Sequence, residues 1–179
     1  MISQKDYKEL QAFTRYDGAL VAAIWTVSFA LYVMGIANPL LMMAGVALAV
    51  YSPFFVARRL RLFRDDVREG CISFRRSYAY SVSVFCHAAL LFAVAQYIYF
   101  SFIDNGYIAN CVAQVFNDPQ ARQMVKAYGM EKMLEESLAA MRAVRPIDYA
   151  LNNLTLNIMI CLALSLPIAG FTRATTKSV

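Results

Sequence analysis

The side chains best suited to chemistry in this sequence are one histidine and four cysteines. His87 directly follows Cys86, and Cys161 lies in a later apolar stretch, so these three together resemble part of a zinc ligand set. Adjacent residues on a helix point about 100° apart, however, and two such neighbours do not converge on one ion. We therefore expect His87 to be a buried histidine bonded to a neighbour, and we predict no metal site and no cofactor.

Sequence motifs of common enzymes are missing. The chain contains no Walker loop, dinucleotide fingerprint, His-Glu-x-x-His or Cys-x-x-Cys motif. Cys71 and Cys111 fall on opposite sides of the predicted membrane, while Cys86 and Cys161 fall within it, so no disulfide is expected. No Asp or Glu lies within the predicted membrane spans, which argues against a carboxylate proton relay. We expect the chain not to be an enzyme.

Amide side chains give the sequence its other polar groups at membrane depth. Gln96 lies seven residues from the outer end of one predicted span, and Asn157 lies eight residues from the outer end of another. On antiparallel helices the two amides share nearly one depth, and Asn153 lies one helical turn outward of Asn157. We predict an amide contact between Gln96 and Asn157, either as a link between helices or as the lining of a path for a small polar solute.

Seven arginines lie between two long apolar runs, in a segment that we predict to be a basic loop over residues 58–76. Short loops rich in Lys and Arg stay on the cytoplasmic side, so this segment orients the spans on both sides of it. We interpret it mainly as a topology determinant. The alternative is a site for anionic lipid headgroups, whose candidate contacts are Arg58, Arg59, Arg61 and Arg64.

The composition is that of an integral membrane protein. The 179 residues are 60% hydrophobic, which is well above the apolar content of soluble domains. The net charge of +5 sits beside apolar spans, where the topology rule explains it without a nucleic-acid partner. The expected environment is the lipid bilayer of a bacterial inner membrane.

Four apolar segments are long enough to cross a bilayer, which requires about 20 helical residues. They cover residues 18–36, 40–57, 77–103 and 149–171. This predicts an all-α, polytopic membrane protein formed by a single domain over residues 1–179, with both termini cytoplasmic. Ala37, Asn38 and Pro39 join the first two spans, so those spans should form a tight hairpin.

The first span carries small residues at every fourth position, namely Gly18, Ala22, Thr26 and Ala30. This spacing lets helix backbones approach closely. We expect intramolecular packing, and a seam between two copies of the chain is the alternative. Residues 1–17 before this span are interpreted as an amphipathic helix at the membrane surface with its charges, Asp17 included, facing water.

Residues 104–148 form the one sizeable polar segment predicted to lie outside the membrane. Asn117 or Asp118 is a candidate cap for a helix over 119–128, Gly129 interrupts it, and a second helix is predicted over 131–144. An apolar stripe on this helical pair should cover the headgroup layer, the tops of the spans or another subunit, and self-packing is expected ahead of a docking role. Its members are Met124, Tyr128, Leu134, Leu138 and Met141.

Short motifs across most of the chain resemble a bacterial family of uncharacterised membrane proteins, the domain-of-unknown-function 4199 family. They are the arginine run leading to Gly70, the Ile72-Ser73-Phe74 step, residues 97–100 (Tyr-Ile-Tyr-Phe), and Gly129-Met130 before residues 131–136. Arg75 and Ser81 stand where members of that family often have glycine, so contacts of the third span should differ here. The resemblance implies the four-span topology and no catalytic residue.

Three functional classes are open to this sequence, and an enzyme acting on lipid is the least favoured of them because the sequence shows no nucleophile–base pair. Two classes account for most of the expectation. The first is a small structural or accessory inner-membrane protein that acts by assembly or by docking a partner, either a second copy or another membrane protein. The second is a small-molecule transporter or channel lined by polar residues of the third and fourth spans. The amides and His87 are the candidate polar contacts within the membrane in either case.

Overall fold

The computed structural model describes residues 4–36 and 38–174, and it is helical almost throughout. Four helices are long and apolar enough to cross a membrane, and they overlap the four predicted spans in the predicted order. The chain is therefore an all-α, multi-pass membrane protein, as predicted. These helices are α1 (Gln4–Met34), α2 (Pro39–Val67), α3 (Phe74–Ile98) and α7 (Pro146–Thr172).

The first two helices form the predicted hairpin. Asn38 caps α2 by accepting a hydrogen bond from the backbone N–H of Leu40 at 3.1 Å, while Ala37 lies outside the described residues. A side chain at Gly45 would lie 2.8 Å from the carbonyl oxygen of Ser28, so α1 and α2 come into backbone contact there. The Ser28 hydroxyl donates to the carbonyl of Gly45 at 2.8 Å and fastens the same crossing.

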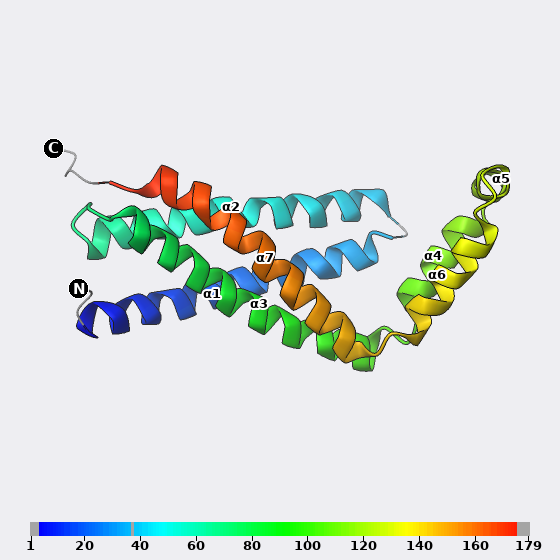
Figure 1. Cartoon of the computed structure of the whole chain (residues 1–179), viewed down its shortest axis with the longest axis horizontal. Coiled ribbons are helices and arrows are strands. Elements are labelled where there is room, and N and C mark those ends of the chain that lie inside the picture. The colour runs from blue at the N-terminus through cyan, green and yellow to red at the C-terminus, as the bar shows by residue number, and fades with distance from the viewer. Residues whose placement is uncertain (1–3, 37, 175–179) are drawn as a thin grey trace.

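Helix α1 packs against α2 and α3, and α3 packs against α7, so the spatial order of the spans is α2, α1, α3, α7 (Figure 1). A Cβ atom added at Gly18 would lie 2.6 Å from that of His87, which shows how closely α1 approaches α3. Gly18 and Ala22 of the predicted small-residue stripe are buried in the bundle, whereas Thr26 and Ala30 are exposed. Intramolecular packing thus accounts for only half of the stripe.

The basic segment is mostly helix, which corrects the prediction of a loop over residues 58–76. Helix α2 continues to Val67 because arginine and leucine favour helix, and because Leu60 and Phe63 stay on its buried face. The helix ends where the N–H of Gly70, at a φ of 81°, donates to the carbonyl of Arg64. Only residues 68–73 connect α2 to α3.

The end of α7 is tied to this turn. Ile72 and Ala174 exchange two backbone hydrogen bonds of 2.9 and 3.1 Å, and the Ile72 side chain is buried. The start of α1, the turn between α2 and α3, and the end of α7 all lie at one end of the bundle (Figure 1). We call this the arginine end.

The outer insertion contains three helices where the sequence predicted two. Helices α5 (Pro119–Ala127) and α6 (Glu131–Ala143) match the prediction, with Asp118 accepting from the N–H of Gln120 and Gly129 at a φ of 63° between them. Helix α4 (Tyr107–Asn117) was not predicted, although the Asp104 carboxylate accepts hydrogen bonds from the N–H groups of Gly106 and Ile108 at its start. We call α4, α5 and α6 the outer arm.

The outer arm leaves the bundle at the end opposite the arginines, with α5 at its far tip (Figure 1). A π-helical segment, η1 (Tyr99–Ile103), ends α3, and Phe100 within it stacks on Tyr149 of α7 at 4.4 Å between ring centroids. The Tyr149 hydroxyl donates to the carbonyl of Met141 at the base of α6. The arm is thus anchored at its base by aromatic residues of the spans.

The cysteines provide a direct test of orientation. We expect a membrane-impermeant maleimide to label Cys111 of α4 in intact cells, and to label Cys71 in the α2–α3 turn only after the membrane is opened. The reason is that short arginine-rich segments resist translocation. Cys86 and Cys161, which lie within spans, serve as internal controls that stay unlabelled. Labelling of Cys71 from outside would reverse the assigned orientation.

Candidate functional site

A carboxylate is buried among three spans near the arginine end of the bundle. The Asp17 side chain on α1 is 1% exposed, and its Oδ1 lies 2.6 Å from Nε of Arg59 on α2. Its Oδ2 accepts a hydrogen bond from the hydroxyl of Tyr80 on α3. We call Asp17, Arg59 and Tyr80 the buried polar triad. The prediction that Asp17 faces water was wrong.

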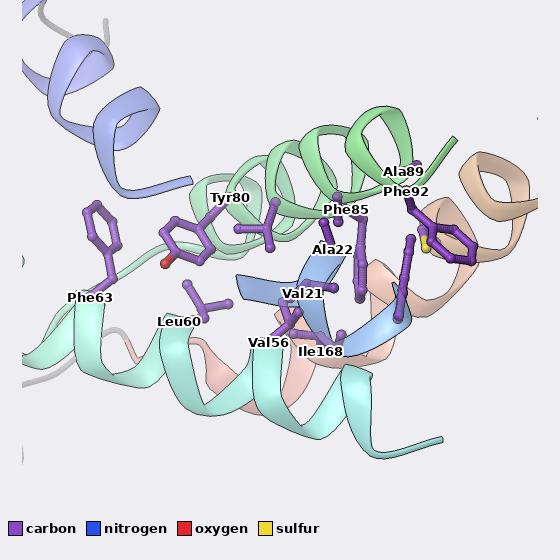
Figure 2. Close-up of a cluster of buried hydrophobic side chains, with 14 of the residues drawn as sticks. Val21, Ala22, Val56, Leu60, Phe63, Tyr80, Phe85, Ala89, Phe92 and Ile168 are labelled. Carbon is purple, nitrogen blue, oxygen red and sulfur yellow. The ribbon is translucent and has the colours of Figure 1, made fainter. Parts of the chain in front are cut away.

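The hydrophobic core surrounds this triad. Tyr80 is fully buried, and its ring stacks on Phe63 with centroids 4.9 Å apart. Figure 2 shows Tyr80 between Phe63 and Leu60 of α2, with Val21 and Phe85 farther along the same core. Because a charge in such surroundings is stable only when it is paired and hydrogen-bonded, Asp17 depends on both of its partners.

A signal for this burial is present in the sequence. Leu10, Thr14, Asp17, Val21 and Trp25 follow one another at intervals of three or four residues, which places them on one helical face. In the structure Leu10 is partly buried, Thr14, Asp17 and Val21 are fully buried, and Trp25 is 9% exposed. Their periodicity, rather than the charge of Asp17, would have identified the position as internal.

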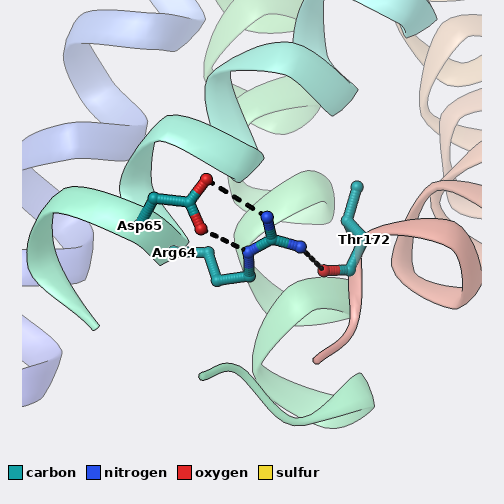
Figure 3. A network of polar contacts seen from close by, with 3 residues as sticks. All are labelled: Arg64, Asp65 and Thr172. Carbon is teal, nitrogen blue, oxygen red and sulfur yellow. Dashed lines mark hydrogen bonds and ion pairs between the residues drawn. The ribbon is translucent and has the colours of Figure 1, made fainter. Parts of the chain in front are cut away.

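Two of the four arginines predicted to contact lipid are bonded within the protein. Arg59 belongs to the buried polar triad. Arg64 makes a two-point contact with Asp65, with distances of 2.7 and 3.1 Å, and also donates to the backbone carbonyl of Thr172 at 3.1 Å (Figure 3). Arg64 therefore links the end of α2 to the end of α7. Within residues 4–36 and 38–174, Arg58 and Arg61 form no ion pair.

The three predicted amides gather around one cavity. Gln96 of α3 and Asn153 and Asn157 of α7 line a space of about 330 Å³ that also borders Ser28 of α1. The predicted amide contact between Gln96 and Asn157 is not seen as a hydrogen bond, although both side chains line this cavity. Asn153 instead donates to the Tyr149 carbonyl at 3.1 Å, and the buried Oε1 of Gln96 has no hydrogen-bond partner in the described part of the chain.

His87 is half-buried and bonded to its own helix. Its Nδ1 lies 2.6 Å from the carbonyl oxygen of Ser83, one turn earlier on α3, and it faces the close approach of Gly18 rather than the amides. No group of three His, Cys, Asp or Glu side chains capable of holding a metal ion was found among the described residues. The surroundings of His87 are those of a structural contact between α1 and α3.

The predicted apolar stripe of the outer arm divides into two parts. Leu134 and Leu138 of α6 are half-buried and border the same hollow as Phe116 of α4, so they pack within the arm. Met124 and Tyr128 at α5 are 61% and 77% exposed. The neighbouring Met133, at the start of α6, is 62% exposed. We call Met124, Tyr128 and Met133 the apolar tip.

Comparison with known proteins identifies the chain only at the level of a family. A family model described as "Protein of unknown function (DUF4199)" matches residues 16–174, which include all three residues of the buried polar triad and the whole outer arm. No curated protein and no solved structure matches the chain.

The buried polar triad should be a major source of stability. We expect Asp17→Ala to lower the free energy of unfolding by about 3 kcal/mol, because it leaves Tyr80 and Arg59 without their acceptor. Glu9→Ala, at an exposed acidic position of the same helix, should change it by less than about 0.5 kcal/mol. Unfolding in detergent, followed by circular dichroism, measures both.

A double-mutant cycle isolates the contact between α1 and α3. Tyr80→Phe removes only the hydroxyl, so its effect should largely vanish once Asp17 is already alanine, giving a coupling energy of about 1–2 kcal/mol. Strict additivity of the two substitutions would contradict the contact.

Proposed function

The chain belongs to the DUF4199 family of proteins of unknown function, and we propose that it is a non-catalytic accessory protein of the bacterial inner membrane that docks another membrane protein. Both termini are cytoplasmic in this proposal, and the outer arm is extracytoplasmic. The arginines gathered at the opposite end of the bundle support that orientation.

The observation that carries this proposal is the apolar tip. Met124, Tyr128 and Met133 expose most of their side chains on the part of the arm that lies farthest from the spans (Figure 1). Packing inside the arm already uses Leu134 and Leu138 on another face. Exposed methionine adapts to differently shaped partner surfaces, and tyrosine is enriched among the residues that dominate binding energy.

The distance of the tip from the spans favours a protein partner over the headgroup layer. The base of the arm is fixed by Tyr149 and by a hydrogen bond of 3.1 Å from Arg142 to Asn110. Helices α5 and α6 contain no fully buried residue. An element this exposed gains most of its stabilisation from what it binds.

Photo-crosslinking in intact cells tests the docking proposal. A photoreactive residue at Met124 or Tyr128 should give one discrete protein adduct, while the same residue at exposed Gln123 of α5 should give little. Met124→Ser with Tyr128→Ser should weaken that association at least tenfold, because the truncated side chains are at its centre. Unfolding should change by less than about 0.5 kcal/mol, since both positions are exposed.

The arm core supplies the control for this experiment. Leu134→Asp should destabilise the arm as well as the association, because Leu134 packs inside it. Adducts formed only with lipid at Met124 and Tyr128, or an association unchanged by the double serine variant, would contradict docking through the apolar tip.

A small-solute channel is the second candidate, favoured by the unpaired Oε1 of Gln96 beside the amide-lined cavity. A polar solute or water in that cavity would satisfy this acceptor.

A swelling assay tests the channel. Liposomes that contain the protein should swell faster than empty liposomes in glycerol or urea. Gln96→Leu with Asn157→Leu should remove the difference, and Asn152→Leu, at an exposed position of α7, should not. Equal swelling of wild-type and empty vesicles would exclude the channel for these solutes.

A further inference from the structure

Helices α2 and α7 border a groove that opens on the outside of the bundle. They meet at the arginine end, where Arg64 donates to the Thr172 carbonyl, and between them lies a space of about 730 Å³. Trp25 of α1 and Phe85 of α3, which stack on each other with centroids 6.1 Å apart, form its floor. The groove is thus closed behind by the core and bounded on both sides by spans.

The lining of the groove is mostly apolar, with Arg61 at one end and the amide of Asn157 at the other. Phe54 and Ala57 of α2 face Leu164 and Ile168 of α7 across it, and Arg61 lies at the arginine end. Ser52 also lines the groove, and its hydroxyl donates a hydrogen bond to the carbonyl of Ala49 at 2.7 Å. That carbonyl lacks its usual helical donor because residue 53 is proline.

The length of the groove corresponds to one leaflet of a bilayer. From Ala49 to Arg61, both of which line it, α2 rises roughly 18 Å over twelve residues at about 1.5 Å each. One leaflet accounts for about 15 Å, half of the hydrocarbon core. With Arg61 at headgroup level, the groove therefore ends near the bilayer midplane, where an acyl chain ends.

Charge complementarity selects the kind of lipid. Arg59 and Arg64 pair with Asp17 and Asp65. Arg61 lines the groove and forms no ion pair within the described part of the chain, although its charge acts on Asp65 at longer range. Arg58 is likewise exposed one turn earlier on α2. A guanidinium beside an apolar channel matches a phosphate carried on an acyl chain.

We propose that this groove binds one anionic phospholipid of the cytoplasmic leaflet. One acyl chain lies between α2 and α7 against Trp25 and Phe85, and the phosphate is held by Arg61. This site is separate from the apolar tip, and it is independent of the docking function proposed above.

Lipid retention by the purified full-length protein tests the headgroup contact. After extraction from vesicles of equal parts phosphatidylglycerol and phosphatidylcholine, native mass spectrometry should find one retained phosphatidylglycerol in preference to phosphatidylcholine. Arg61→Gln should lower that preference about fivefold, which corresponds to about 1 kcal/mol per cation near an anionic surface. Arg75→Gln removes an equal charge from an exposed position on α3 that does not line the groove, and it should leave the preference unchanged. Equal losses in both variants, or no loss in either, would overturn the site.

A matched pair of substitutions tests whether the acyl chain occupies the groove. Ala49→Phe places a ring in the groove from an exposed position on α2 and should abolish the retained lipid. Ala47→Phe, an equally exposed alanine that does not line the groove, should have no effect. Retention of phosphatidylglycerol by Ala49→Phe would overturn the proposal. If chemical crosslinking of the wild-type protein gives a dimer, and Ala49→Phe loses that dimer while it retains the lipid, the groove would be assigned to a second copy of the chain instead.

Discussion

The buried carboxylate of Asp17 is the constraint on which the packing of the spans depends. A negative charge among Leu60, Phe63 and Tyr80 is stable only with its partners in place, so α1, α2 and α3 must meet in one register. Non-directional packing of apolar helices in lipid specifies register poorly, whereas hydrogen bonds to a buried carboxylate specify it strongly. Gly18 directly follows Asp17 on α1 and contacts His87 on α3. Because Gly18 has no side chain, α1 and α3 can come close enough for these hydrogen bonds.

The two ends of the bundle differ because their polar contacts differ. At the arginine end, the contact of Arg64 with Thr172 and the paired backbone bonds of Ile72 and Ala174 join α2, α3 and α7. Toward the opposite end, α2 and α7 are separated by an apolar groove and then by the amide-lined cavity. Fixed contacts at one end and open space along the rest leave room for lipid or a polar solute between the outermost spans, without loss of the core.

The sequence alone determined the architecture of this protein. Four apolar segments of sufficient length, the arginine-rich segment and the polar insertion predicted the all-α multi-pass fold, because a bilayer admits few ways to bury apolar helices. Capping signals at Asp118 and Gly129 also located α5 and α6. The sequence analysis did not predict α4, whose capping side chain, Asp104, lies three residues before the helix begins. It also did not predict the continuation of α2 through the arginines, since charge suggests a loop while helix propensity and the apolar periodicity of Leu60 and Phe63 favour helix.

Only the tertiary structure decided what the polar side chains do. Equal depth placed Gln96 and Asn157 together, and both line one cavity, but depth alone did not show that they form no hydrogen bond, because depth does not fix the rotation of a helix about its axis. The same limit applies to the arginines, of which Arg59 and Arg64 are used within the protein while Arg61 faces the groove. Asp17 was assigned to water from its charge, yet it is the most deeply buried charge of the described chain. Its partners lie 42 and 63 residues away along the sequence, and only folding brings them to it.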